Sequence, residues 1–402
     1  MRNHDLVVFG EDWASHPSST QHLIKRQLNS SKVLWINSIG LRQPGLSYED
    51  MKRVYNKAKA MMVKSDVEKT PHHKNLTIVN PKTFPAPQSR WMRQICSATL
   101  SNNILNEMAK VDISRPILWT SLPTAVDIVG KLGECASVYY CGDDFQYLAG
   151  VDNEIVTEME AELAEKVDLI LVASRELEKK FPPHKTQYLP HGTDFNLFSA
   201  PCDRPCDLPV GKPIAGFYGS IENWVDVSLI GEAANVLPEW NFVLIGDIKT
   251  DVSILRNRDN VFFLGKKLHH QLPAYVQNWH VAMLPFLNNE QIHSCNPLKL
   301  REYLASGTPI VSTRFPAAEQ YQNQIYISDS EKDFIDSIVR SSFDVNQNDV
   351  KQHMLENIHS WSDVLGLNNL FVERQCVVAN DSWESRSAQL SHWLQQLSVG
   401  SQ

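Results

Sequence analysis

The sequence predicts an α/β protein made of two Rossmann-like domains that face each other across a cleft. Three observations lead to this prediction. The chain has 402 residues, a length that suits two domains of roughly 100–200 residues each. Short apolar runs alternate with helical patterns, as in parallel sheets covered by helices on both faces. The series of runs stops and restarts once, around the proline-rich stretch at residues 196–213.

The first domain is expected over residues 1–195 and provides the acceptor-binding half. Each of its predicted strands is a short run of aliphatic and aromatic side chains bounded by polar or turn-forming residues. These strands are Asp5–Phe9, Val33–Asn37, Leu76–Val79, Ile117–Thr120, Ser137–Cys141, Asp168–Ala173 and Gln187–Pro190.

The second domain is expected over residues 214–347, after a linker at residues 196–213. Residues 348–402 have a helical pattern, and we expect this tail to cross back over the domain junction. The predicted strands of the second domain are Ile214–Gly219, Asn241–Gly246, Val261–Leu264, Val281–Pro285, Pro309–Ser312 and Gln324–Ile327.

Charge and hydropathy narrow the classes of function. The formal net charge is −8, which excludes general affinity for nucleic acid. All apolar runs are far shorter than the roughly 20 residues that span a bilayer. The start of the chain lacks the apolar region and cleavage site of a signal peptide. We therefore expect a cytoplasmic protein without nucleic-acid partners.

Cysteine and histidine give no pattern typical of a metal site. Seven Cys, an odd number, fit reduced thiols better than a disulfide framework. Cys202 and Cys206 are close in sequence, but a zinc site would need two further ligands. His72-His73 and His269-His270 lack metal-ligand spacing. The sequence therefore predicts no metal.

A basic segment interrupts the otherwise acidic chain. Residues 42–93 contain 11 Lys and Arg against 4 Asp and Glu. Within this segment, residues 51–64 place apolar side chains at helical spacing with cations around them. Such a helix can bind the surface of an anionic membrane, or it can pack against the core with its cations in solvent. Peripheral attachment to the inner face of the cell membrane is therefore one expectation.

The turn after the first predicted strand reads Gly10-Glu-Asp-Trp13. It is not the dinucleotide fingerprint GxGxxG, because a second glycine is missing, and this argues against a dehydrogenase. Carboxylates and an indole at this position suit a sugar-binding cleft, so Glu11 and Trp13 are candidate acceptor residues. The alternative is that the turn only caps the start of a helix.

The most informative stretch runs from Ser294 to Thr313. Asn296 suits a helix N-cap and Pro297 the first helical position, so a helix is predicted to begin there and end at Gly307. Free N–H groups at its start and the charge of Lys299 favour an anion such as a diphosphate.

Glu302 lies three residues after Lys299, on the same face of that helix. A carboxylate there can accept hydrogen bonds from two ribose hydroxyls. The alternative is a surface helix with an incidental Lys and Glu.

The run Asn296-Pro-Leu-Lys-Leu-Arg-Glu-Tyr-Leu-Ala-Ser-Gly-Thr-Pro-Ile-Val resembles the nucleotide-sugar signature of GT-B glycosyltransferases, especially those of bacterial surface polysaccharide biosynthesis. Pro190–Phe198, Ile214–Asp226 and Val261–Lys266 match the same family in the expected order. The resemblance covers about residues 130–315. It implies the GT-B fold and a nucleotide-sugar donor site in the second domain.

Individual roles in the donor site are carried over from this resemblance. It places Lys299 near the diphosphate and Glu302 on the ribose. It also implies that the nucleotide contacts the following residues: Gly219, Ser220, Gly265, Lys266, Asn296 and Pro297.

The sequence departs from retaining members of the family at two places. Many of these enzymes have a second Glu eight residues before the ribose Glu, where this chain has Ser294. Many also have Arg and Lys after the first strand of the second domain, where this chain has Glu222-Asn-Trp. Both departures weaken a retaining assignment.

Asp143 and Asp144 follow the predicted strand that ends at Cys141. Residues at the carboxyl end of such a strand line the cleft, and an inverting transfer needs a base with a raised pKa. The stretch is similar to the one that carries the base in xanthan-type glucuronosyltransferases, where the first Asp matches Asp143. Asp144 is a further cleft candidate. The alternative is that both aspartates cap the helix that follows.

These observations predict a hexosyl- or glycuronosyltransferase without a metal or other cofactor. The donor would be a nucleotide diphosphate-sugar, and the acceptor a hydroxyl of a polysaccharide, such as capsule or exopolysaccharide, or of a lipid-linked oligosaccharide. Three alternatives stay open: a retaining transferase, a nucleotide-sugar epimerase of the same fold, and a two-lobed solute-binding protein.

Overall fold

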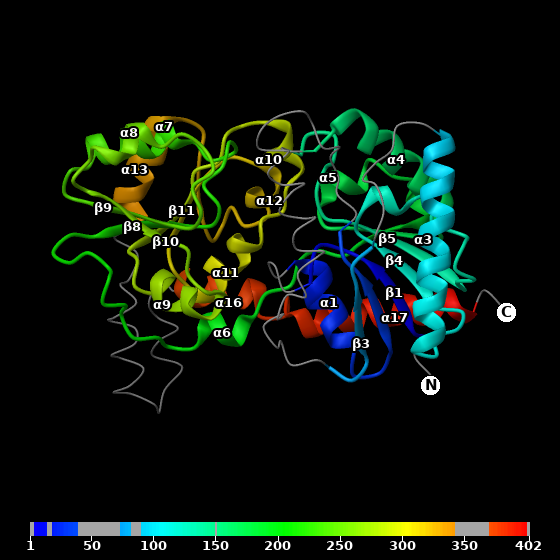
Figure 1. Ribbon diagram of the computed structural model, residues 1–402. Coiled ribbons are helices and arrows are strands. Elements are labelled where there is room, and N and C mark those ends of the chain that lie inside the picture. Colours follow the sequence, from blue (N-terminus) through cyan, green and yellow to red (C-terminus); the bar gives the residue numbers. More distant parts are fainter. Residues whose placement is uncertain are drawn as a thin grey trace, which may run out of the picture. The chain divides into compact units, whose positions relative to one another are not determined.

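The computed structural model of the chain describes residues 4–13, 18–38, 73–81, 90–148, 151–341 and 370–399. The chain forms two compact units (Figure 1). The first comprises Met1–Pro190 with Arg386–Gln402, and the second comprises His191–Ser385. The basic helix expected at residues 51–64 lies outside the described residues.

The first unit is built on a parallel sheet of seven strands in the order β3-β2-β1-β4-β5-β6-β7. Its central strands are completely buried, as expected for a parallel sheet covered by helices on both faces. The strands are β1 (Leu6–Phe9), β2 (Val33–Ile36), β3 (Leu76–Val79), β4 (Ile117–Thr120), β5 (Ala136–Cys141), β6 (Leu169–Val172) and β7 (Thr186–Tyr188).

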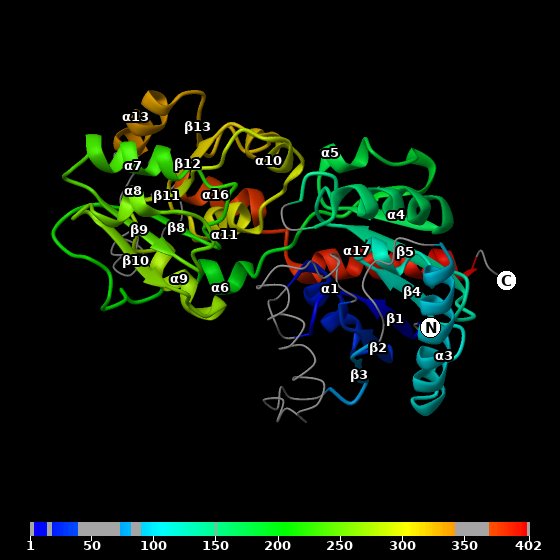
Figure 2. The same cartoon turned by 45° about the horizontal axis from the view of Figure 1, so that its top comes forward.

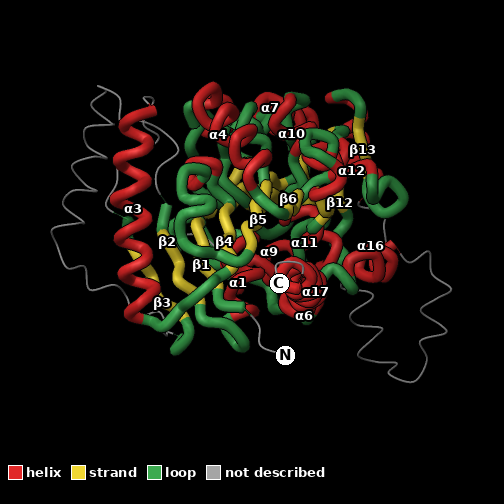
Figure 3. The backbone as a smooth tube through the Cα atoms, turned by 90° about the vertical axis from the view of Figure 1, so that its right-hand side faces the viewer, coloured by secondary structure: helices red, strands yellow, loops and turns green. Residues whose placement is uncertain are grey.

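Helices of the first unit pack on opposite faces of this sheet (Figures 2 and 3). α3 (Arg90–Lys110) covers β1, β2 and β4, and α4 (Asn153–Lys166) covers β5 and β6 on the same face. α1 (Ser19–Gln27) lies on the other face, where Gln27 donates a hydrogen bond of 2.8 Å to Ser387 of α17 (Trp383–Val399). Three short segments complete the unit: α5 (Arg175–Glu178) and the 3₁₀ turns η1 (Pro123–Ala125) and η2 (Pro183–Lys185).

The second unit has a parallel sheet of six strands in the order β10-β9-β8-β11-β12-β13. One large apolar cluster contains its central strands and helices. The strands are β8 (Ile214–Tyr218), β9 (Asn241–Ile245), β10 (Val261–Gly265), β11 (Val281–Leu284), β12 (Ile310–Thr313) and β13 (Tyr326–Ser328). The helices are α6 (Phe195–Ser199), α7 (Val227–Val236), α8 (Ser253–Arg256), η3 (His269–Gln271), α9 (Leu272–Val276), α10 (Glu290–Ser294), α11 (Leu298–Ser306), α12 (Pro316–Glu319), α13 (Glu331–Ser341) and α16 (Leu370–Val378).

The strand order of each sheet reverses beside its first strand. The reversal lies between β1 and β4 in the first unit and between β8 and β11 in the second. Open parallel sheets bind ligands outside the carboxyl ends of the strands at such a reversal. The two turns that follow β1 and β8 are therefore the places where each unit is expected to meet a ligand.

The predicted fold class is confirmed, because both sheets are parallel and each predicted strand is present within a few residues of its expected place. The helical pattern at the end of the chain corresponds to α17, whose residues from Arg386 onward belong to the first unit. Across the described ranges, no helix combines the length and apolar character that crossing a bilayer demands.

Candidate active site

Three glycines lie side by side at the carboxyl edge of the second sheet. Gly219 follows β8, Gly246 follows β9, and Gly265 ends β10. All three have positive φ, at 134°, 141° and 66°, a region that side chains other than glycine rarely adopt. The Gly246 N–H donates to the Gly265 carbonyl oxygen at 3.0 Å. The edge therefore exposes backbone where a ligand can approach closely.

A side chain at either of the first two glycines would collide with the site. A Cβ at Gly246 would lie 2.0 Å from the carbonyl oxygen of Gly219, and a Cβ at Gly219 would lie 2.4 Å from Nζ of Lys299. Because Gly219 has no side chain, Lys299 of α11 can reach the turn after β8, where the strand order reverses.

Lys299 stands in the first turn of α11 and is partly buried. Its Nζ lies 4.5 Å from the ring centroid of Phe217 and 5.4 Å from that of Phe286. Burial lowers the pKa of Lys299 to about 8, although Cys295, Glu302 and Glu222 act in the opposite direction. Within the described residues Lys299 makes no ion pair and no hydrogen bond. Aromatic faces and more distant negative charges only partly offset this charge, so the position suits an anionic ligand.

Glu302 lies one turn further along α11, with its side chain 11% exposed. Its Oε2 accepts a hydrogen bond of 2.5 Å from the Tyr218 hydroxyl, and its Oε1 lies 2.8 Å from Nε2 of His269. The hydrogen bond to Glu302 raises the pKa of His269, although burial acts against it and Asp194 adds to the rise. Each carboxylate oxygen can accept a second hydrogen bond, so Glu302 can still bind a hydroxyl.

Asn296 is not the N-cap of α11, and this expectation was wrong. The helix begins at Leu298, with Pro297 in the cap position. The Oδ1 of Asn296 instead accepts a hydrogen bond of 2.6 Å from Arg301. Both residues are 2% exposed, and a buried guanidinium needs such an acceptor. The predicted end of the helix is confirmed, because Gly307 caps it with φ 75°.

The remaining donor candidates lie around the same edge. Ser220 follows Gly219 and is partly buried. Lys266 is exposed, and its Nζ lies 3.7 Å from Asp247. Their contacts with phosphate and base, like those of Gly265 and Pro297, stay predictions.

A cavity of about 400 Å³ opens at the carboxyl ends of β11, β12 and β13. It shares Phe286 with the surroundings of Lys299. Carboxylates dominate its charged lining, and its cation Arg314 is already paired with Glu319 and Asp329. Among its lining residues the cavity therefore offers an anionic ligand no lysine and no unpaired arginine.

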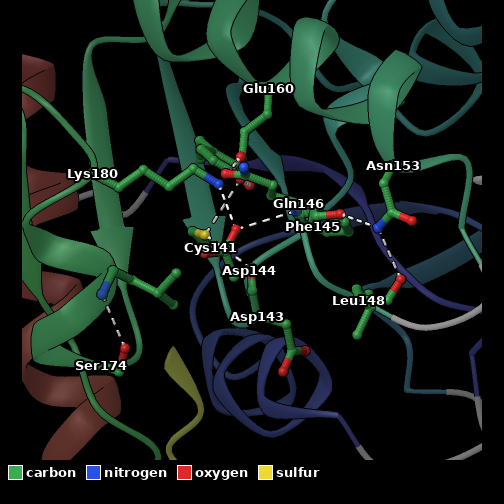
Figure 4. Close-up of polar contacts among 12 residues, drawn as sticks. Cys141, Asp143, Asp144, Phe145, Gln146, Leu148, Asn153, Glu160, Ser174 and Lys180 are labelled. Atoms are coloured by element: carbon green, nitrogen blue, oxygen red, sulfur yellow. Dashed lines mark hydrogen bonds and ion pairs between the residues drawn. The ribbon is translucent and has the colours of Figure 1, made fainter. Parts of the chain in front are cut away.

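In the first unit the two adjacent aspartates after β5 have different surroundings. Asp144 is held: its Oδ1 lies 2.7 Å from Nζ of Lys180 and accepts the N–H of Gln146 at 3.2 Å. Asp143 is exposed, makes no side-chain hydrogen bond within the described residues, and points away from Lys180 (Figure 4). Within the described residues, the carboxylate of Asp143 is therefore the less engaged of the two.

The pKa of Asp143 is raised above that of an ordinary aspartate. Although its side chain is exposed, the protein atoms around the carboxyl desolvate it and, with the negative charges of Glu11 and Asp144, raise the pKa to about 6. At pH 7 the carboxylate is then mostly ionised and still a better proton acceptor than an ordinary aspartate.

Glu11 and Trp13 lie in the turn after β1. Glu11 accepts a hydrogen bond of 2.8 Å from Ser18, the N-cap residue of α1. The Trp13 ring stands edge-on to Trp35, with their centroids 4.7 Å apart. Glu11 thus has two neighbours in the structure, the start of α1 and Asp143. These contacts are compatible with both interpretations of the turn, a helix cap and a part of the acceptor site.

Sequence reasoning missed the partners of the predicted residues. Tyr218 and His269 contact Glu302, while Lys180 pairs with both Asp144 and Glu160. Tyr218 directly precedes Gly219, so its place at the end of β8 could have identified it as a site residue. The other three come from segments with no motif of their own.

The second unit carries a known domain. Residues 212–342 match the family described as Glycosyl transferases group 1. The chain is 26% identical over 242 residues to the putative teichuronic acid biosynthesis glycosyltransferase TuaH of Bacillus subtilis. That alignment covers 54% of this chain and 61% of TuaH, so the chain spans less than two thirds of its relative.

Solved structures with the same fold include a sucrose-phosphate synthase and the protein HepE. Sucrose-phosphate synthase from Thermosynechococcus elongatus superposes with a TM-score of 0.67 at 15% identity, covering 99% of this chain and 100% of that one. HepE of Anabaena in complex with UDP superposes with a TM-score of 0.65 at 10% identity, covering 98% and 100%. The fold is therefore that of GT-B glycosyltransferases, and residues 212–342 of the second unit match the group 1 family.

Proposed function

We propose that the chain is an inverting glycosyltransferase. It would transfer a hexosyl or glycuronosyl group from a nucleotide diphosphate-sugar to a hydroxyl of a polysaccharide or lipid-linked oligosaccharide. The observation that carries this proposal is Lys299, a partly buried cation to which the described residues offer no carboxylate partner, placed against Gly219 at the sheet reversal of the unit that matches the group 1 family. A diphosphate supplies the missing negative charge.

The donor is assigned to the edge formed by β8, β9, β10 and α11. Lys299 and the free N–H groups of the α11 N-terminus would bind the diphosphate, and Glu302 would accept the ribose hydroxyls. Gly265 and Lys266 would contact the base. HepE has been crystallised with UDP, with UDP and glucose, and with UDP-glucose, which supports a uridine donor as the first to test.

Asp143 would supply the acid–base step. Its carboxylate takes the proton of the acceptor hydroxyl while that oxygen bonds to the anomeric carbon and the bond from this carbon to the diphosphate breaks. The proton ends on Asp143, and the charge that develops on the leaving diphosphate is stabilised by Lys299.

No metal is part of this proposal, because Lys299 and the helix N-terminus can offset the charge of the leaving group. The described residues hold no group of three His, Cys, Asp or Glu side chains suited to a metal.

The acceptor is proposed to be a saccharide that contacts Glu11, Trp13 and the region of Asp144. The name of TuaH, which refers to teichuronic acid biosynthesis, supports a surface polysaccharide or its precursor. Contact with an anionic membrane stays a prediction, since it rests on residues 51–64.

The decisive experiment incubates the protein with a panel of nucleotide sugars and candidate acceptors and measures release of nucleotide diphosphate. Release that depends on acceptor, with inversion at the anomeric carbon by NMR, is expected. Lys299→Ala should abolish it, whereas Lys332→Ala, which removes an exposed lysine of α13, should not. Conversion of a nucleotide sugar into its epimer without acceptor would instead identify an epimerase.

A further inference from the structure

Lys180 is the centre of a polar cluster inside the first unit. Its Nζ lies 2.7 Å from Oδ1 of Asp144 and 2.6 Å from Oε2 of Glu160. The other oxygen of Glu160 accepts a hydrogen bond of 2.5 Å from the Tyr139 hydroxyl. Figure 4 shows Lys180 reaching Asp144 and Glu160 while Asp143 points away from them.

The burial of this cluster makes the lysine indispensable to its charge balance. The side chains of Glu160, Asp144 and Lys180 are 1%, 10% and 24% exposed. In such a buried place, water screens the repulsion between two carboxylates only weakly, and each carboxylate needs a cation nearby. Lys180 serves both, and it thereby ties the end of β5 to α4 and to the turn after α5.

We propose that Lys180 is a positioning residue for Asp143. It holds Asp144 in the turn closed by the Gln146 N–H, which fixes the peptide that joins the two aspartates. It also offsets the Asp144 charge beside the reactive carboxyl. The inference rests on the proposed function, in which Asp143 accepts the proton of the acceptor.

The charges around Asp143 indicate how the loss of Lys180 would change the pKa of Asp143. Glu11 from the turn after β1 and Asp144 on the same loop both raise the pKa of Asp143. Without Lys180 the charge of Asp144 is no longer offset, so the pKa of Asp143 rises further. The other titratable side chains at this end of β5 stay neutral near pH 7, because burial raises their pKa: Tyr140 and Cys141.

The test compares Lys180→Met and Lys180→Arg with the matched control Lys179→Met. Lys179 is the neighbouring lysine, 70% exposed and paired with Glu176 at 2.7 Å. The measurements are kcat/KM against pH with the best donor and acceptor of the panel, and UDP affinity by calorimetry.

For Lys180→Met we expect kcat to fall by about 10- to 100-fold and the acidic limb of the pH profile to move to higher pH, with UDP affinity unchanged. Lys180→Arg should recover most of the rate, and Lys179→Met should behave as wild type. An acidic limb that stays in place in a folded Lys180→Met protein overturns the inference.

A double-mutant cycle tests whether Lys180 acts through Asp144. Asp144→Asn should move the acidic limb to lower pH, and adding Lys180→Met to it should shift the limb no further. An additional shift would show a route that bypasses Asp144 and would contradict the proposal. If Lys180→Met alone does not fold, Lys180→Met with Glu160→Gln removes the unpaired buried charge and allows the same comparison.

Asp143→Asn, measured in parallel, separates this inference from the proposed function. If turnover collapses in Asp143→Asn but the limb of Lys180→Met stays in place, only the role of Lys180 is refuted. If Asp143→Asn turns over like wild type, the base assignment itself is wrong.

Discussion

Replacing Lys299 by Met should make the protein more stable and unable to bind its donor. A pKa lowered from 10.5 to about 8 corresponds to about 3 kcal/mol of unfavourable free energy for the charged form. The side chain is only partly buried, so solvent screens part of this and we expect a gain of about 1–2 kcal/mol. Met keeps most of the stem that packs on Phe217 and Phe286. For a unit of this size the gain raises Tm by about 3–6 °C.

Differential scanning calorimetry of the free and UDP-loaded proteins measures both effects. UDP at about 100 times its Kd should stabilise wild type by about 2.7 kcal/mol and leave Lys299→Met unchanged. The advantage of Met should be full below pH 8 and fade as the pH rises toward 10.5, because only the unfolded lysine then binds the proton. Lys332→Met, which changes an exposed lysine, is the matched control. A Lys299→Met protein that melts lower than wild type, or that UDP still stabilises, would refute this account of the cation.

The remaining predictions concern the other site residues. UDP affinity should fall up to tenfold per pH unit above pH 8 as Lys299 loses its proton, and Lys299→Arg should remove this dependence in calorimetric titrations. Glu302→Gln should lower affinity for UDP by about 5- to 30-fold and reduce the preference over 2′-deoxy-UDP, since Gln keeps one acceptor oxygen but loses the charge; equal loss for both nucleotides would contradict a ribose contact. Asp143→Asn should lower turnover by about 10²- to 10⁴-fold with UDP affinity kept, and a larger loss in Asp144→Asn would reverse the two roles. His269→Gln should lower Tm most at acid pH, because the raised pKa of His269 contributes stability that is lost as the pH rises through it; a Tm difference that is independent of pH would count against this ion pair.

The fold could be predicted because parallel strands have a simple signature. Strands buried on both faces must be continuously apolar, and β1, β4 and β8 are completely buried in the structure. Their alternation with helices then leaves few topologies. Strand order was not accessible in this way, because it depends on contacts between segments far apart in the sequence. The pairing of β8 with β11, where the strand order reverses, is one of those contacts.

The candidate site was predictable where one local segment determines it. Lys299 and Glu302 share one helix face, so their proximity follows from helical spacing alone. The contact of Glu302 with His269 joins residues 33 positions apart, and no periodicity relates them. Asn296 was misassigned for a different reason: Pro297 takes the cap position one residue later, and the Asn296 side chain accepts a hydrogen bond from the buried Arg301 instead.

In each unit, some charged or polar side chains at the proposed site have an ion-pair or hydrogen-bond partner, and others have none among the described residues. Asp144 and Asn296 are typical helix-capping and turn residues, and both are engaged by a buried or partly buried cation, Lys180 or Arg301. Asp143 and Lys299, one and three positions away, have no such partner in the described part of the chain. An unpaired charge lowers stability and is retained where a ligand or a transferred proton completes it. The paired neighbours hold these two charges in place. Substitutions at Asp144 and Asn296 should therefore act first on stability and geometry. Substitutions at Asp143 and Lys299 should act first on turnover and donor binding.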